Sequence, residues 1–288
     1  MDNIILTGML KDFVTRHELE EETLDRQFEK FANYCLLKTD YYDSFEFEKV
    51  GTGECIGVDG VAVVIGGVIV NELDDASQFT KGQFEAKFVF SQAKTSAKFD
   101  LGDFLKFTST VKVFFGTDEA AIPKELIEAF SIKKLIYERA SKLRQLPTIE
   151  IAYVYSGKFD LEKSRIAPNI EGEVAALKAM PYLFSDVVWY VHDGDSIARL
   201  YRETQNDIQK EISFQRHVAL PPITGARAAY LGVVKCEDYV KLIQKENGEL
   251  NKGLFFENVR DFLGDINPVN EDIAQTIRNP DERDRLPY

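Results

Sequence analysis

The sequence has few thiols and imidazoles that could bind a metal. Among its 288 residues there are three cysteines and three histidines. Cys35, Cys55 and Cys236 lie far apart and form no C-x-x-C pair. Zinc sites and disulfide frameworks are built from closely spaced cysteines and histidines. The sequence therefore predicts neither a structural zinc site nor a fold held together by disulfides.

Long apolar runs are also missing. The longest apolar run near the start is 4–6, whereas a membrane-spanning helix needs about 20 apolar residues and a signal peptide needs about 7 to 15. Hydrophobic residues nevertheless make up 44% of the chain, which is enough for a sizeable core. We therefore expect a soluble, cytoplasmic protein with no membrane partner.

Positive charge is scarce, because 35 Lys and Arg residues face 48 Asp and Glu residues and give a formal net charge of −13. Broad affinity for nucleic acid depends on phosphate neutralisation by Lys and Arg, so this balance argues against it, although it is compatible with a local basic groove. The sequence has two basic clusters. The first, around the candidate site described below, could form such a groove and comprises Lys87, Lys94, Lys98 and Lys106. The second, at 133–144, could be a nucleic-acid surface or a solvated helix face, and we favour the solvated face.

The stretch from Gly57 to Lys94 predicts a β-hairpin and a third strand. A Gly-Gly pair at 66–67 separates two β-branched runs, which is typical of a two-residue hairpin turn. In the third strand, Gln92 and Lys94 share a face and lie roughly 7 Å apart along the strand. They could converge on one ion or phosphate if Asp59 comes alongside. These three residues form a candidate metal-dependent phosphodiesterase centre.

The remaining periodicity predicts an α/β fold: a mixed sheet flanked by helices, followed by a smaller α+β region. A strand, a helical crossover and another strand favour parallel pairing. We expect one domain at 1–193 and a second region at 194–288. The expected helices are 1–14, 18–37, 102–115, 123–144, 171–184, 194–206 and 236–246. Besides the hairpin and third strand, we expect a half-buried strand at Phe45 and Phe47 and strands at 148–155, 187–191, 212–220 and 228–234. The segment 71–87 is expected to be a polar loop.

Two further motifs have ordinary explanations. The glycine-rich stretch 51–57 lacks the spacing of a phosphate-binding loop, so we interpret it as a turn. His192 and Asp193 could begin a metal phosphohydrolase site, but such a site needs more ligands than three scattered histidines supply. We expect them to form a strand end that enters an Asp-Gly turn.

Two separate segments resemble one family. The run Phe-Phe-Glu-Asn-Val-Arg-Asp-Phe-Leu-Gly at 255–264, followed by Val269, Asn270 and Ile273, resembles the signature that opens the AIPR domain of abortive-infection phage-resistance proteins. Upstream, 57–60 (Gly-Val-Asp-Gly) and 92–96 (Gln-Ala-Lys-Thr-Ser) resemble the restriction-endonuclease-like domain, of the PD-(D/E)xK and Mrr type, that precedes it in such proteins.

The resemblance implies an anti-phage protein whose first domain is a Mg²⁺- or Mn²⁺-dependent DNA endonuclease. Asp59, the Gln92 side chain and the Ala93 carbonyl would hold the ion, Glu29 would assist from its helix, and Lys94 would orient water or stabilise charge on the phosphate. From the sequence alone, Glu29 has a second interpretation as a solvated carboxylate beside an apolar helix stripe. The implied partners are nucleic acid, with DNA favoured, a phage or host protein trigger, and a second copy of the chain.

An alternative function keeps the nuclease fold without catalysis, as a binding or sensing module in phage defence. Gln92 replaces the commoner carboxylate, and a neutral amide is a weaker ligand for a hard cation. The net acidity of the chain also favours this alternative.

The resemblance further implies that the chain continues in relatives, so 194–288 would be the start of a truncated AIPR-type domain, or a surface covered by a partner. An apolar set at 255–263 has few later residues to pack against. We therefore predict that limited proteolysis releases a resistant fragment ending between about 193 and 210, with cleavage after Gly248 first. Equal resistance of the whole chain, measured by mass spectrometry of the fragments, would contradict this prediction.

Overall fold

The computed structural model describes residues 3–41, 44–158, 167–180, 183–205, 214–221, 229–244 and 276. At its centre is a five-stranded mixed sheet with the order β2-β1-β3-β4-β5. Strand β1 pairs antiparallel with β2 and β3, whereas β3, β4 and β5 are parallel. The predicted hairpin, third strand and parallel crossover are therefore confirmed. The strands are β1 (Gly60–Ile65), β2 (Val68–Val70), β3 (Ala86–Lys94), β4 (Thr148–Tyr155) and β5 (Asp186–His192).

The hairpin turn depends on its two glycines. Gly66 and Gly67 have φ values of 60° and 86°, a region where a Cβ atom is strained. This conformation lets the short β2 turn back onto β1 with Ile65 opposite Val68. The Gly-Gly signal in the sequence thus has the backbone geometry that it predicts.

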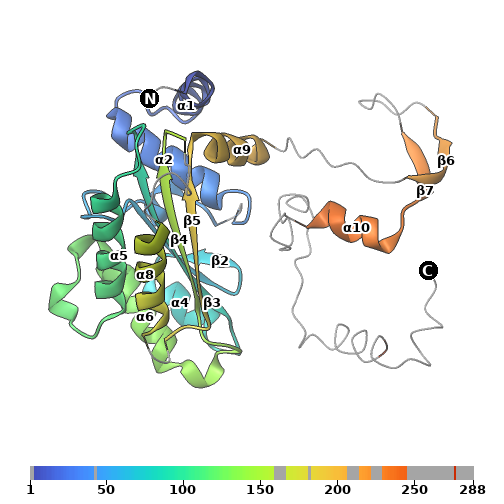
Figure 1. Ribbon diagram of the computed structural model, residues 1–288. Helices are drawn as coiled ribbons and strands as arrows, with labels where there is room; N and C mark the ends of the chain where they lie inside the picture. Colours follow the sequence, from blue (N-terminus) through green and yellow to red (C-terminus); the bar gives the residue numbers. More distant parts are fainter. Residues whose placement is uncertain are drawn as a thin grey trace. The chain divides into compact units, whose positions relative to one another are not determined.

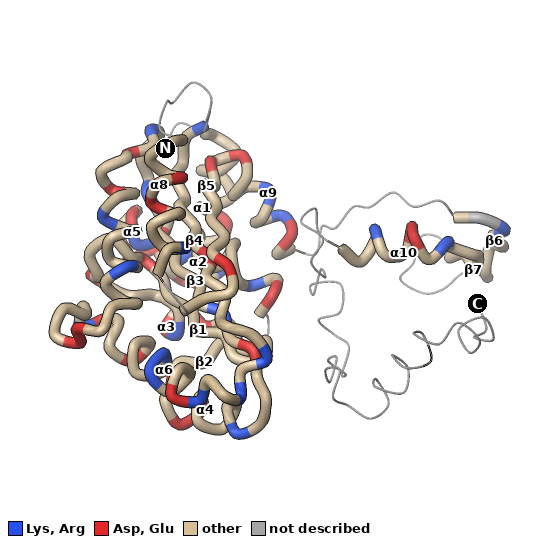
Figure 2. Tube along the Cα trace, turned by 60° about the horizontal axis from the view of Figure 1, so that its bottom comes forward, with Lys and Arg blue, Asp and Glu red and all other residues tan. Residues whose placement is uncertain are grey.

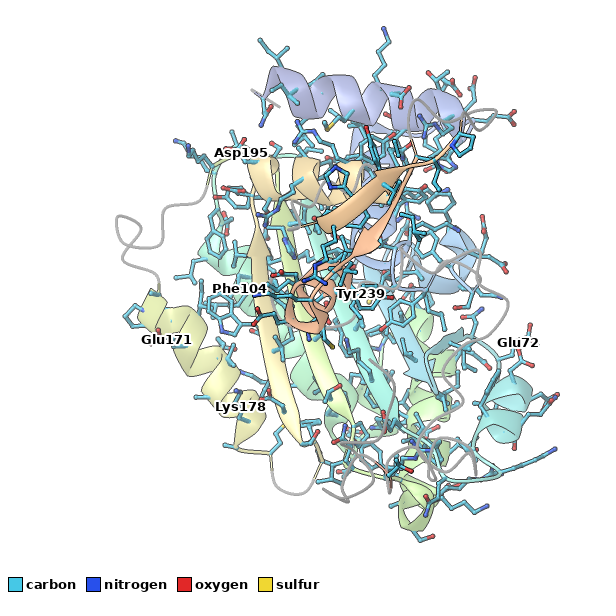
Figure 3. The ribbon with its side chains drawn as sticks, turned by 90° about the vertical axis from the view of Figure 1, so that its right-hand side faces the viewer. Glu72, Phe104, Glu171, Lys178, Asp195 and Tyr239 are labelled. Carbon is cyan, nitrogen blue, oxygen red and sulfur yellow. The ribbon has the colours of Figure 1, made fainter. Side chains whose placement is uncertain are left out.

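Helices cover both faces of the sheet (Figure 1), which confirms the predicted α/β class. One core cluster joins the sheet to three helices, α5 (Leu101–Phe115), α6 (Ile127–Glu138) and α8 (Ala167–Lys178). Another joins the opposite face to α1 (Ile4–Arg16), α2 (Leu24–Leu37) and α9 (Gly194–Thr204). Figure 3 shows Glu171 and Lys178 near the two ends of α8 and Asp195 at the start of α9.

Alternation along β3 divides its side chains between the two clusters. Phe88 and Phe90 are fully buried in the first, with ring centroids 5.2 Å from Phe115 and 5.1 Å from Phe114 respectively. Val89 belongs to the second cluster. Strand β3 is therefore buried on both faces and holds the two helical layers at fixed positions around its end.

Several local predictions are wrong. The alternation around Phe45 and Phe47 belongs to no strand, because Phe47 begins the short helix α3 (Phe47–Val50). A pattern of so few residues cannot separate a strand from one helical turn. The expected loop between β2 and β3 contains α4 (Leu73–Phe79), a helix with two aspartates in its first turn. These charges suit the positive end of a helix dipole.

The expected helix 123–144 is shorter, and its basic cluster is a solvated face except at Lys133, because Lys134 and Arg144 are exposed. Helix α6 covers 127–138, with 3₁₀ turns at Lys124–Leu126 and Ala140–Lys142. Lys133 is only 7% exposed, and its Nζ donates to the carbonyl oxygens of Phe114 (2.7 Å) and Gly116 (3.3 Å). Lys133 thereby caps the C-terminal end of α5, where unpaired carbonyls carry partial negative charge.

The packed body continues past the expected boundary at Asp193. Ile197, Ala198 and Tyr201 of α9 are buried in the second cluster, and the Tyr201 hydroxyl donates to Asp12 Oδ2 of α1 at 3.0 Å. Further along, β6 (Gln215–Ala219) pairs antiparallel with β7 (Tyr230–Val233), and α10 spans Cys236–Ile243.

The chain divides into two units, Met1–Gly253 and Leu254–Tyr288. The family signature at 255–264 and the apolar set within it lie outside the described residues. Among the residues that are described, no helix has both the length and the apolar character to cross a membrane.

The burial of Lys133 predicts a pH-dependent stability. Burial, with a smaller contribution from Lys134, lowers the pKa of Lys133 from 10.5 to about 8. Because the folded state binds this proton less tightly than the unfolded state, the penalty is full below pH 8 and is relieved as the pH rises to 10.5. Relative to Lys133→Met, the unmodified protein should gain up to about 3 kcal/mol of unfolding free energy over that range.

Urea unfolding at pH 7.5 and 10 would measure this gain. Lys134→Met is a matched control, because Lys134 is 48% exposed and pairs with Glu119 at the surface. The control should show the same pH slope as the unmodified protein. Equal slopes for Lys133→Met and the unmodified protein would contradict the prediction.

Candidate functional site

Asp59 lies where β1 and β3 begin to pair. Its backbone N–H donates to the Ser91 carbonyl at 2.9 Å, and its carboxylate Oδ2 accepts the backbone N–H of Ala93 at 2.8 Å. The Asp59 side chain thus continues the hydrogen bonding between the two strands just before the first residue of β1. Asp59 is 7% exposed, so its carboxylate is held by the sheet rather than by solvent.

Gln92 and Lys94 lie near the end of β3 and share one face of that strand, as alternation predicts. Gln92 is 2% exposed, and its Oε1 is buried with no hydrogen-bond partner among the described residues. Lys94 is half-buried. Its positive charge lowers the pKa of Asp59 and so opposes part of the increase that burial causes. A buried acceptor without a donor is uncommon in folded proteins and often marks a functional site.

Helix α2 directs a polar stripe toward Asp59. Arg26, Glu29 and Asn33 are spaced i, i+3 and i+7, which places them on one side of a helix. Arg26 Nη1 donates to Glu29 Oε2 at 2.6 Å and to the Gly53 carbonyl at 2.7 Å. The Glu29 side chain is 16% exposed, so it is a partly buried, paired carboxylate and not the solvated one of the alternative interpretation.

Asn33 fixes the backbone at Asp59. Its Nδ2 donates to the Asp59 carbonyl at 3.2 Å, while its Oδ1 accepts the Ser91 hydroxyl. Gly60 packs directly beneath this pair, and a Cβ atom there would overlap Asn33 Oδ1 and Ser91 Oγ. We call Asn33, Gly60 and Ser91 the Asn33 clip. It sets the position from which the Asp59 carboxylate reaches Ala93.

Two neighbouring carboxylates are electrostatically strained at this site. Burial and, to a smaller extent, the charge of Asp59 raise the pKa of Glu29 to about 7, even though Arg26 and Lys94 oppose both effects. Burial also raises the pKa of Asp59, against the Ala93 N–H, Lys94 and Arg26. Raised carboxyl pKa values indicate that the negative charges are incompletely compensated. A bound cation would compensate them.

The donor set fits a hard cation such as Mg²⁺. Two carboxylates and an unpaired amide oxygen are the oxygen ligands that such ions prefer, and Gln92 Oε1 has no competing partner among the described residues. In the described ranges there is no group of three or more His, Cys, Asp or Glu side chains placed to hold a metal. Any ion here would therefore depend on Glu29 and Asp59 together with neutral oxygen ligands.

The sequence found only part of this arrangement. It identified Glu29, Asp59, Gln92, Ala93 and Lys94, and the structure brings Glu29 and Asp59 into mutual electrostatic range while joining Asp59 to Ala93 by a hydrogen bond. The contribution of the Ala93 carbonyl stays a prediction. Sequence reasoning missed Arg26, Asn33 and Ser91. The helical spacing of the first two with Glu29 was the available signal.

The expected basic groove around the site is incomplete. Lys87 lies near the opposite end of β3 and pairs with Glu150 Oε2 at 3.1 Å. Lys106 is 65% exposed and pairs with Asp103 on α5. Strand alternation places residues on a face, but it does not bring the two ends of a nine-residue strand together.

The two weak motifs have structural roles. The Gly51–Gly57 stretch is tied down by Arg26 at the Gly53 carbonyl and by the Thr52 hydroxyl, which donates to the Val58 carbonyl. Asp193 is the N-cap of α9 and accepts the Ser196 N–H at 2.9 Å. Both match the ordinary explanation that we favoured, except that the Asp-Gly pair begins a helix.

Comparisons of the chain with models of protein families, with curated proteins and with solved structures found no match. The site must therefore be interpreted from its own geometry and chemistry.

The Asn33 clip predicts a strong effect of a single methyl group. Gly60→Ala should lower the unfolding free energy by about 1 to 3 kcal/mol, because the clip residues are buried and cannot move aside freely. Gly82→Ala is the control, since a Cβ at Gly82 meets no atom within 4 Å, and it should change stability by less than about 0.5 kcal/mol. Urea denaturation of both variants tests this, and equal stabilities would contradict the clip.

Proposed function

We propose that this chain is a metal-dependent nuclease that hydrolyses phosphodiester bonds, with DNA as the favoured substrate. The observation that carries the proposal is the buried Asp59 and the partly buried Glu29 near the end of β3, where Gln92 Oε1 lacks a partner among the described residues and Lys94 supplies positive charge. Carboxylates with raised pKa values beside a cationic side chain are concentrated at functional sites.

Each residue has a distinct role in this proposal. Asp59 and Glu29 provide the charged ligands for Mg²⁺ or Mn²⁺, and Gln92 provides a neutral one. The Ala93 N–H keeps Asp59 in place through its hydrogen bond. Asn33 holds the Asp59 backbone. Arg26 neutralises Glu29 while the ion is absent and keeps that carboxylate beside the site.

Bound there, Mg²⁺ or Mn²⁺ would supply positive charge to the phosphate and lower the pKa of water. Lys94 adds a second positive charge that stabilises the developing negative charge on the phosphate, and its ammonium can orient the attacking water. Charge stabilisation and the orientation of water thus fall to Lys94 and the ion, while Asp59, Glu29 and Gln92 serve as ligands.

We further propose that this activity serves cytoplasmic defence against phage, with a phage or host protein as trigger and with self-association of the chain. The support is the resemblance of 57–60, 92–96 and 255–264 to abortive-infection proteins. The last of these segments lies outside the described residues, so its contribution rests on the sequence alone.

A second candidate function is a non-catalytic binding or sensing module with the same fold. Two observations favour it: Gln92 stands where a carboxylate would bind a cation more strongly, and the net charge is −13. In the view of Figure 2, acidic and basic residues are interspersed along the chain of the body that contains the sheet. Cleavage activity separates the two candidates.

We predict that the purified protein cleaves DNA only with Mg²⁺ or Mn²⁺. Asp59→Ala and Lys94→Ala should each lower the cleavage rate by at least about 100-fold, because each removes charge that acts on the phosphate. Lys98→Ala is the control, as Lys98 is exposed and lies beyond β3. Unreduced cleavage by both site variants would remove Asp59 and Lys94 from the mechanism.

Gln92→Glu gives a separate prediction. A carboxylate in place of the amide should tighten Mn²⁺ binding by about tenfold or more, because hard cations prefer charged oxygen ligands. Isothermal titration calorimetry measures this affinity without requiring catalysis. An unchanged affinity would show that residue 92 does not contact the ion.

A further inference from the structure

A polar row crosses the sheet at the level of the site. Parallel pairing places Gln92 of β3 directly beside Tyr153 of β4. In the antiparallel pairing of β1 with β3, Gly60 lies opposite Ser91. Asp59, which precedes Gly60, therefore comes opposite Gln92, on the side away from Tyr153. Tyr153 belongs to the same core cluster as Phe88 and Phe90, and Gln92 shares their face of β3 by alternation. Three neighbouring strands thus each bring one polar residue to a single level.

Two members of this row have unmet hydrogen-bonding groups. Within the described part of the chain, Gln92 Oε1 is buried and has no donor, and the buried Tyr153 hydroxyl, which the backbone N–H of Asp100 approaches, has no acceptor for its own proton. A phenol can donate a hydrogen bond and an amide oxygen can accept two, so each group offers what the other lacks. Adjacent strands are only about 4.8 Å apart. The two side chains therefore stand next to each other on one face of the sheet, although no hydrogen bond joins them in this structure.

The Tyr153 ring is held in place by aromatic packing. Its centroid lies 5.0 Å from that of Phe99 and 5.8 Å from that of Phe104, which is labelled in Figure 3. Tyr153 has no exposed surface. A ring fixed in this way presents its hydroxyl at a constant position on the sheet face.

We propose that Tyr153 is a positioning residue for Gln92, and that its hydroxyl donates to Gln92 Oε1, directly or through one water, when the site holds a divalent cation. This inference rests on the proposed metal-dependent function. One lone pair of Oε1 accepts from Tyr153, and the other is then aimed at the ion beside Asp59. Such partners of metal ligands typically change metal affinity by about 10- to 100-fold.

The neutral amide explains why such a partner matters at residue 92. Glutamine has a single oxygen, so rotation of its amide by half a turn would present an NH₂ group to the cation. A glutamate has two equivalent oxygens and needs no such selection. The effect of removing the Tyr153 hydroxyl should therefore be large beside Gln92 and small beside a glutamate.

The test is a double-mutant cycle of Tyr153→Phe and Gln92→Glu, with Mn²⁺ affinity measured by calorimetry on the full chain. We expect Tyr153→Phe to weaken binding by about tenfold in the native background. In the Gln92→Glu background the loss should fall below about threefold. Equal losses in both backgrounds, or none in either, would overturn the positioning role.

Unfolding without metal provides the second measurement. Tyr153→Phe removes a buried hydroxyl whose proton has no acceptor among the described residues, so metal-free stability should change less than in a variant that loses a donated hydrogen bond. Tyr137→Phe is the matched control: the Tyr137 hydroxyl donates to the Leu183 carbonyl at 2.6 Å, so its loss should lower stability and leave Mn²⁺ affinity unchanged. A metal-free loss of stability in Tyr153→Phe as large as that in Tyr137→Phe would indicate a structural role and overturn the inference.

The cycle also distinguishes a failure of the positioning role from a failure of the proposed function. If the native protein binds Mn²⁺ and Tyr153→Phe binds it equally well, the positioning role fails and the proposed function stands. If the native protein binds no Mn²⁺, both fail.

Discussion

The burial of the Asp59 carboxylate is the constraint on which the arrangement of the site depends. A carboxylate with 7% exposure loses most of its hydration, and that loss must be compensated by hydrogen bonds or opposite charge. Here the compensation comes from Ala93 N–H on β3, with Lys94 and Arg26 adding positive charge. The contributions come from one strand and one helix, so the carboxylate is stable only when α2 and β3 are both docked.

The same constraint explains why α2 carries polar residues on a side that faces the sheet. The helix is buried in the second cluster through Phe28, Phe31 and Ala32. Asn33, on the same helix, donates to the Asp59 carbonyl, and Glu29 interacts electrostatically with the Asp59 carboxylate. An apolar stripe alone would leave the Asp59 carbonyl with only the long hydrogen bond from the Thr52 N–H, at 3.5 Å. The helix therefore combines a packing role with a role in holding the site.

Much of the fold could be predicted because its signals are local. The glycine pair of the hairpin, the alternation of Phe88 and Phe90 and the β-branched run of β4 each specify an element within a few residues. The failures concern contacts between distant segments. Nothing in the sequence around Lys133 shows that its ammonium meets the end of α5, so a charged residue was interpreted as solvated.

The candidate site divides in the same way. Asp59, Gln92 and Lys94 could be found from strand alternation, and the resemblance added Glu29. Arg26 and Asn33 share a helix side with Glu29, but spacing gives only the side and not what it faces. Ser91 points away from Gln92 along β3, and its role with Asn33 depends on how α2 docks.

Ala93 belongs to two structures at once. Its backbone N–H fixes Asp59, while its side chain packs in the opposite cluster with α2. Packing therefore constrains the volume at residue 93 and not its chemical function, because any residue other than proline offers the same N–H. Alternation places the side chains of residues 92 and 93 on opposite faces of β3. A change of the candidate ligand at residue 92 consequently leaves the contacts of residue 93 with the α2 layer in place.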